Sequence, residues 1–305
     1  MAEELYGALT SRLGLDKLAP EQRIKGLLTV AAEDLIQFSP ELVALGPVID
    51  NDSIPSMASF SNIGHDGGLH LPGKTWCKEL FLIESQFDFA TKMPCSRSAN
   101  ALRKGSIFAL VNLNNRQDGI NAAFTKSIRE SLGDAAASKL LDAYRISPET
   151  SDIDTLEKII SFVTDASFYA PAVKLGQAWP GLSYLCHFNE RNPWDGIYKG
   201  RANHLLDVAY MWGNYNQKYT NQNWTVARAL AEDMVRFTAG KGSLPSFNKE
   251  GNVVTIYGPS DDNISSKHST LGAEDTGRNH AFFRLADEVG GLDACLDAMV
   301  RFLQG

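Results

Sequence analysis

The feature that most constrains the fold is a pair of short apolar blocks, far apart in the chain, that are typical of buried β-strands. Lys78 to Phe87 (KELFLIESQF) contains the continuous block Leu80–Ile83, and Leu182 to Phe188 (LSYLCHF) is rich in β-forming residues. Continuous apolar runs of this length are typical of parallel strands that are covered on both faces. Long stretches with helical periodicity lie between them. The sequence therefore predicts an α/β fold with a few mainly parallel strands packed with many helices.

Helical periodicity recurs along the rest of the chain. We expect helices within residues 2–46, 117–143, 154–179, 223–239 and 279–303. Ser151 or Asp152 is suited to cap the N-terminus of the third of these. Residues 253–257 predict a short last strand.

Composition excludes several classes of function. The 305 residues are 44% hydrophobic and 21% charged, which suits one large globular domain or a large piece of one. The net charge of −7 gives no indication of nucleic-acid or anionic-membrane binding. No apolar run approaches the roughly 18 residues of a membrane span, and the N-terminus lacks the features of a secretory signal. The four scattered cysteines form no CxxC pair, so the default expectation is a cytoplasmic chain with reduced thiols.

One histidine stands in a pattern that points to chemistry. Gly200–Gly213 reads GRANHLLDVAYMWG, and His204 in it follows a loop that itself follows the predicted strand Leu182–Phe188. This GxxxH…D..Y.[FW]G pattern resembles the type-B carboxylesterase/lipase family, the cholinesterase-like α/β-hydrolases. The loop Gly46–Pro55 and residues 221–247 are similar to segments that the family carries in the same chain order.

The resemblance implies that the chain is the C-terminal portion of a carboxylesterase-type α/β-hydrolase domain spanning residues 1–305, with the N-terminal part of the sheet missing. Residues 89–104 are basic and lack periodicity. Against the family pattern they form an insert, which is either a surface loop or translated intron in a mis-assembled gene model. Because the central strands of the family would precede Met1, Lys78–Phe87 and Leu182–Phe188 are expected to expose sheet edges.

The resemblance also implies two members of a Ser–acid–His triad. His204 matches the histidine that takes the proton from the nucleophilic serine, and Asp88 matches the acid that orients that histidine. Glu84 is the reserve candidate for the acid. The alternatives are a hydrogen-bonded loop histidine and a solvated carboxylate at the end of a strand.

The nucleophile itself is absent from these 305 residues, because no GxSxG occurs in them. Ser183 precedes a strand, Ser243 follows a helix and runs into a proline, and Ser260 has no helix after it. The segment His65-Asp66-Gly67-Gly68 resembles the HGG-type oxyanion loop only weakly, because it reads HDGG and lies in mid-chain. We therefore expect ancestral carboxylic-ester hydrolysis of small-molecule esters, with no activity of the chain alone; the alternative is a non-catalytic binding or interaction module of the same fold.

Other residues give weaker indications. His65, Asp66 and His70 could in principle bind zinc, but their spacing matches no metal motif, and neither a metal nor a cofactor is predicted. His187 alternates within a strand and is expected to be packed or hydrogen-bonded. The remaining aromatic candidates, which could line a pocket around His204, are Trp179, Trp194, Trp212 and Tyr215.

Overall fold

The computed structural model describes residues 2–38, 52, 58–63, 73–88, 118–196, 198–242 and 244–304. The chain divides into two compact units, residues 1–57 with 94–115, and residues 58–93 with 116–305. The proposed insert at 89–104, nearly all of the Gly46–Pro55 loop and the segment with His65 and His70 lie outside the described residues. The assignment of residues 1–305 to one hydrolase domain stays a prediction.

In the smaller unit the described residues form three helices, as expected for residues 2–46. They are α1 (Ala2–Arg12), α2 (Pro20–Thr29) and α3 (Ala32–Phe38). Pro20 occupies the first helical position of α2, where its missing N–H has no helical partner to lose. Arg12 donates from Nη1 to the carbonyl of Phe38 at 3.3 Å, which ties α1 to the end of α3.

The larger unit is built on a sheet of four strands. They are β1 (Glu79–Ser85), β2 (Leu182–Phe188), β3 (Val253–Tyr257) and β4 (Ser266–Thr270), in the spatial order β1-β2-β3-β4. The first three strands are parallel and β4 runs antiparallel to β3, so the mainly parallel sheet is confirmed. The prediction that Leu182–Phe188 exposes a sheet edge is wrong, because β2 is paired on both sides, with β1 and with β3.

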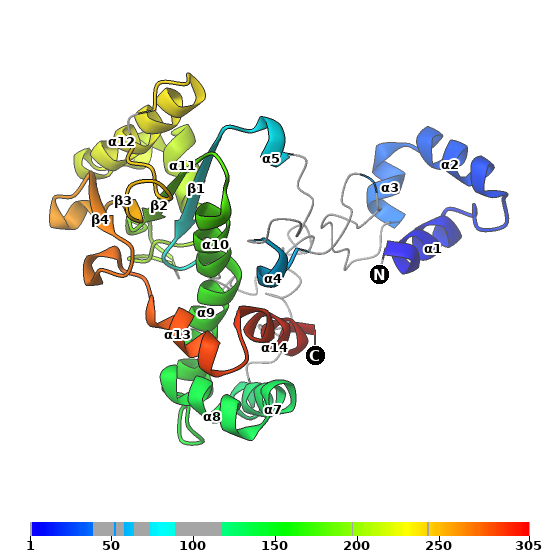
Figure 1. Cartoon of the computed structure of the whole chain (residues 1–305). Coiled ribbons are helices and arrows are strands. Elements are labelled where there is room, and N and C mark those ends of the chain that lie inside the picture. Colours follow the sequence, from blue (N-terminus) through cyan, green and yellow to red (C-terminus); the bar gives the residue numbers. More distant parts are fainter. Residues whose placement is uncertain are drawn as a thin grey trace. The chain divides into compact units, whose positions relative to one another are not determined.

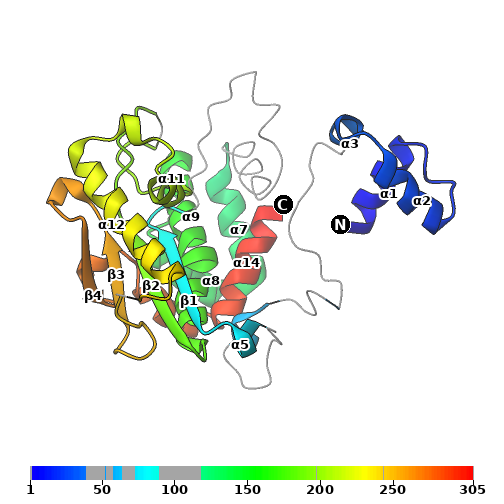
Figure 2. The same cartoon turned by 90° about the horizontal axis from the view of Figure 1, so that it is seen from above.

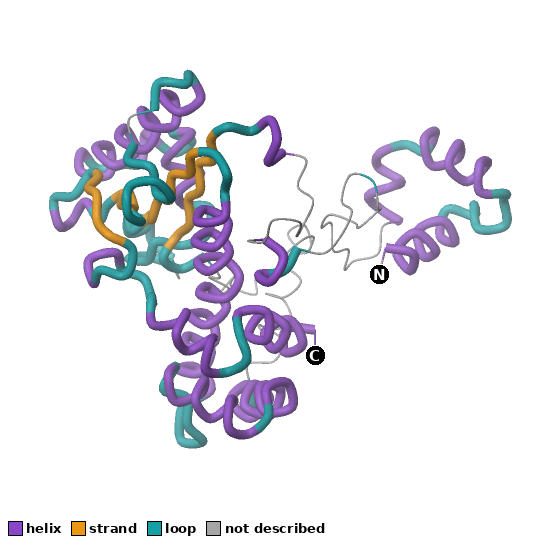
Figure 3. The backbone as a smooth tube through the Cα atoms, in the orientation of Figure 1, coloured by secondary structure: helices purple, strands orange, loops and turns teal. Residues whose placement is uncertain are grey.

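Helices fill the connections between the strands (Figure 1, Figure 3). Before β1 lie the short helices α4 (Phe60–Ile63) and α5 (Gly73–Trp76), and between β1 and β2 lie α7 (Ile120–Leu132), α8 (Asp134–Ala143), α9 (Asp152–Thr164), the π-helical turn η2 (Asp165–Tyr169) and α10 (Ala170–Ala178). Between β2 and β3 lie α11 (Leu206–Trp212), η3 (Asn216–Lys218) and α12 (Asn221–Thr238), and between β3 and β4 lies η4 (Ser260–Asp262). After β4 come η5 (Glu274–Thr276), α13 (Ala281–Glu288) and α14 (Leu292–Gln304).

Glycines divide two of the expected helices. The region 117–143 forms α7 and α8, separated at Gly133, whose φ is +78°. The region 279–303 forms α13 and α14, separated at Gly290 and Gly291 with φ of +113° and +99°. Backbone at positive φ cannot continue a right-handed helix, and glycine adopts it without a steric penalty.

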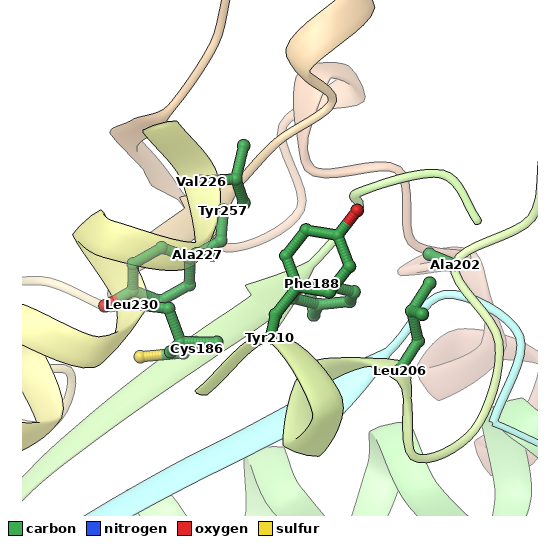
Figure 4. Packing of buried hydrophobic residues seen from close by; sticks show 9 residues of the cluster. All are labelled: Cys186, Phe188, Ala202, Leu206, Tyr210, Val226, Ala227, Leu230 and Tyr257. Carbon is green, nitrogen blue, oxygen red and sulfur yellow. The ribbon is translucent and has the colours of Figure 1, made fainter. Parts of the chain in front are cut away.

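Each face of the sheet carries its own core. Cys186 and Phe188 of β2 pack with Leu206 and Tyr210 of α11 and with three residues of α12, as Figure 4 shows. Leu185 of β2 points the opposite way and packs on the side of η2 and α10. This period of two places α11 and α12 on one side of the sheet and η2 and α10 on the other. Figure 2 shows α12 and α9 on opposite sides of the strands. None of the helices in the described part of the chain has the length and apolarity of a membrane span.

Candidate active site

The site is built where the chain extends past the carboxyl ends of β1 and β2. Phe87 bridges Asn203 in parallel, and the Phe87 amide donates to the carbonyl of Ala202 at 2.8 Å. The amide of His204 donates to the carbonyl of Phe87 at 3.2 Å. Residues 202–204 therefore lie beside residues 86–88, which brings His204 next to Asp88 although 116 positions separate them in the chain.

The loop that leaves β2 is closed by its own hydrogen bonds before it reaches His204. The backbone amide of Asn192 donates to the carbonyl of Arg201 at 3.0 Å, and its backbone carbonyl accepts from the amide of Gly200 at 2.8 Å. Its side-chain Nδ2 also donates to Oδ1 of Asn203 at 2.9 Å. The loop thus returns the chain to a defined position beside β1.

The predicted pair is in contact. Nδ1 of His204 lies 3.2 Å from Oδ1 of Asp88. The second oxygen of Asp88, Oδ2, accepts from the amide of Ser85 at 2.7 Å. Asp88 is only 7% exposed, so it is not the solvated strand-end carboxylate of the alternative interpretation. The His204 side chain is 43% exposed and rests edge-on against the ring of Phe168, with ring centroids 5.6 Å apart.

The surroundings of His204 make its imidazole more basic than usual. The hydrogen bond to Asp88 raises the pKa of His204 above its usual value, burial opposes this, and the charges of Asp88 and Asp207 add to it. Burial raises the pKa of Asp88, and the hydrogen bond with His204 offsets part of that rise. Burial, with repulsion from Asp88, raises the pKa of Asp207 to about 6.

The geometry defines what the imidazole can do. A neutral His204 that donates Nδ1–H to Asp88 keeps a free lone pair on Nε2. Such an imidazole can accept a proton at Nε2, and the adjacent carboxylate stabilises the imidazolium that forms.

The reserve acid belongs to a different cluster. Glu84 is 4% exposed, and its Oε1 lies 2.5 Å from Nδ1 of His187 and 2.7 Å from Nε of Arg278. His187 is fully buried and its Nδ1 contacts Glu84, which confirms the expectation that it is packed or hydrogen-bonded. Arg278 was not predicted to matter; the signal for it was a glutamate inside an apolar strand, because buried carboxylates are almost always paired.

Three serines were considered as nucleophiles, and the structure describes two of them, Ser183 and Ser260. The hydroxyls of both are already hydrogen-bonded. Ser183 is fully buried and its hydroxyl donates to the carbonyl of Gly176 at 2.7 Å. Ser260 is 4% exposed, and both its hydroxyl and its amide donate to Glu190 at 2.7 Å. Ser243 lies outside the described residues.

The sequence did not indicate the aromatic residue that packs against His204, which is Phe168. Phe168 belongs to the π-helical turn η2, and no pattern in the sequence announces such a turn. Of the four aromatic residues predicted to line a pocket, Trp194 packs against Tyr215 with ring centroids 5.1 Å apart, Trp179 is buried and Trp212 is 70% exposed. The placement of Trp179, Trp194, Trp212 and Tyr215 around His204 stays a prediction.

The part of the chain that the structure describes contains no candidate metal site. No three His, Cys, Asp or Glu side chains gather there in a way that could hold an ion. The weak candidates His65, Asp66 and His70 are not among these residues.

Comparisons with known proteins place the fold. No family model matches the sequence, and no curated protein matches it. Solved structures do match: a PNB esterase at a TM-score of 0.54 and 18% identity, over 90% of this chain and 53% of the esterase. A thermophilic PNB esterase matches at a TM-score of 0.55 and 17% identity, over 90% of this chain and 53% of that one. Juvenile hormone esterase from Manduca sexta matches at 0.50 and 13%, over 100% of this chain and 56% of the esterase.

These similarities confirm the fold expected from the resemblance. PNB esterase and juvenile hormone esterase are type-B carboxylesterases, and the chain shares the α/β fold of that class. At these levels of identity the likeness concerns the fold alone. The chain spans about half the length of the esterases it matches.

Proposed function

We propose that this chain supplies the general base, His204, and the orienting acid, Asp88, of a serine-type carboxylic-ester hydrolase. The observation that carries the proposal is the hydrogen bond of 3.2 Å between Nδ1 of His204 and Oδ1 of Asp88 at the carboxyl end of β1. The similarity to esterase folds supports ester hydrolysis as the reaction class. Small carboxylic esters are the proposed substrates.

The nucleophilic serine is proposed to come from outside these 305 residues. They contain no GxSxG, and the hydroxyls of Ser183 and Ser260 are buried and donate to other groups. A base without a nucleophile in reach cannot perform acyl transfer. The isolated chain should therefore neither hydrolyse p-nitrophenyl acetate above background nor react with a fluorophosphonate probe. Robust turnover by the isolated chain that His204→Ala abolishes would overturn this part of the proposal.

Transcript sequencing across the 5′ end tests the proposal further. A GxSxG reading frame upstream, expressed together with these residues, should give esterase activity. His204→Ala in that longer protein should lower kcat by about 10²–10⁴-fold, the usual contribution of a general base. A longer protein that is equally active with and without His204 would contradict the role assigned to it.

A transcript without that motif would favour the second candidate, a non-catalytic binding module. The observation in its favour is that the segment after His204 exposes apolar side chains: Leu205 is 59%, Trp212 70% and Tyr215 47% exposed. Exposed apolar side chains mark an interaction site where they form a contiguous patch.

A further inference from the structure

Arg278 is a buried cation at the same end of the sheet as Asp88. Its side chain is 2% exposed. Nε donates to both carboxylate oxygens of Glu84, at 2.7 and 3.0 Å, and Nη1 donates to Oδ1 of Asn189 at 2.6 Å. The residue thereby joins the chain after η5 to the carboxyl ends of both β1 and β2.

A third contact of Arg278 reaches the backbone of β1. Nη2 donates to the carbonyl oxygen of Glu84 at 3.1 Å. That carbonyl belongs to the same peptide unit as the amide of Ser85, which donates to Oδ2 of Asp88 at 2.7 Å. In a trans peptide the carbonyl and the amide point in opposite directions. Arg278 therefore holds one side of the peptide unit while Asp88 is held by the other.

The contacts continue in series to the imidazole. Asp88 uses Oδ2 for the amide of Ser85 and Oδ1 for Nδ1 of His204. Hydrogen bonds in series polarise one another, and a charged donor at one end strengthens those that follow. A guanidinium on the Glu84 carbonyl makes the Ser85 amide a better donor, so Oδ2 is anchored and Oδ1 stays aimed at His204.

We propose that Arg278 is a positioning residue for Asp88, acting through the Glu84–Ser85 peptide. The inference rests on the proposed role of the Asp88–His204 pair and adds to it the group that fixes the acid. Glu84 serves in this arrangement as the counter-ion that keeps the buried guanidinium in place, with His187 on its other side. A purely structural Arg278 would stabilise the fold without influencing the titration of His204.

The geometric role can be separated from the effect of charge. Glu84→Gln combined with Arg278→Met removes one negative and one positive charge, so the net charge of the chain is unchanged. Arg278→Lys keeps the positive charge, but an ammonium cannot reproduce the planar fork that reaches the carboxylate and the carbonyl together. The matched control is Lys139→Met with Glu288→Gln, which removes an exposed ion pair of 3.2 Å elsewhere.

The experiment is an NMR titration of the full chain with isotopically labelled histidine. The chain has six histidines, and His204→Gln assigns the signal of interest. Asp88→Asn should lower the titration midpoint of His204. The E84Q/R278M variant should lower it in the same direction, and Arg278→Lys should do so by a smaller amount, while the K139M/E288Q control keeps the wild-type midpoint.

Two results would overturn the inference, and they have different meanings. If Asp88→Asn lowers the midpoint but Arg278→Lys and E84Q/R278M leave it at the wild-type value, Arg278 is only structural and the proposed pair stands. If Asp88→Asn also leaves the midpoint unchanged, both the relay and the pair are wrong. Arg278→Lys retains the cation and so decides the question even if the double variant fails to fold.

Discussion

Replacing Asp165 by asparagine should remove a large part of the pH dependence of stability. Asp165 begins the π-helical turn η2 and is 6% exposed. Its Oδ2 accepts from the hydroxyl of Tyr144 at 2.6 Å and from Nδ2 of Asn279 at 2.8 Å. Burial, the largest cause, raises the pKa of Asp165 from 3.8 to about 7; the negative charge of Glu84 adds to the rise, and Arg278 opposes it.

The sign and the size of the effect follow from that pKa. Because the pKa is higher in the folded state, the folded chain binds a proton that the unfolded chain has already lost between pH 4 and 7. The contribution of Asp165 to the free energy of unfolding is therefore greatest at the acidic end, falls as pH rises to about 7, and is flat above it. Two pH units at about 1.4 kcal/mol each give a loss of about 3 kcal/mol between pH 5 and pH 8 from this one carboxyl group.

The assay is urea unfolding followed by tryptophan fluorescence at pH 5 and pH 8. All five tryptophans lie in the larger unit, which also holds Asp165, so the signal reports on the correct part of the chain. Asp165→Asn keeps a carbonyl oxygen for the two donors and should reduce the wild-type loss between the two pH values by about 3 kcal/mol. Asp142→Asn, at an exposed position of α8, is the control and should leave the loss unchanged. If Asp165→Asn retains the full wild-type loss, the raised pKa is refuted.

Three further predictions concern the packing that supports the site, each measured as a change in the free energy of unfolding. Leu230→Ala, at a fully buried position of α12, should cost about 2–5 kcal/mol, whereas Val235→Ala, 65% exposed on the same helix, should change stability by less than about 0.5 kcal/mol; equal losses would contradict the assigned core face. Thr220→Ala removes the side chain that accepts from the amide of Asn223 and should cost about 1 kcal/mol, and no loss would rule out the capping box. Gly181→Ala places a Cβ 2.0 Å from the carbonyl oxygen of Lys78 and should cost about 1–3 kcal/mol by forcing β1 and β2 apart; wild-type stability would contradict this close approach.

The fold was predictable where local pattern and burial agree. The apolar blocks at Leu80–Ile83, Leu182–Phe188 and Val253–Tyr257 became β1, β2 and β3 because both faces of these strands are covered by helices. The strand β4, Ser266–Thr270, was missed because its sequence SKHST is polar, as suits a half-exposed strand next to β3. Pattern alone also did not divide the helices at Gly133 and Gly290–Gly291, since the flanking apolar periodicity continues through each break.

The candidate site was predictable only in part. The pairing of Asp88 with His204 was predicted from the resemblance to the family's motif order. The structure brings the two residues together because the strands that precede them, β1 and β2, are adjacent and parallel. The contact between Arg278 and Glu84 joins residues 194 positions apart. The only sign of it in the sequence is the charged residue Glu84 within an apolar strand. The contact of Phe168 with His204 depends on a π-helical turn that shifts the register of the following residues, and this too has no periodic signature.

The central claim is that Asp88 fixes His204 as a proton acceptor at Nε2, and the tautomer of the neutral imidazole tests it most directly. In ¹⁵N NMR spectra recorded above the pKa of His204, we predict the tautomer with the proton on Nδ1 in the wild-type chain. Asp88→Asn should shift the population toward the proton on Nε2. A wild-type imidazole that carries its proton on Nε2, or whose tautomer is unaffected by Asp88→Asn, would contradict the account.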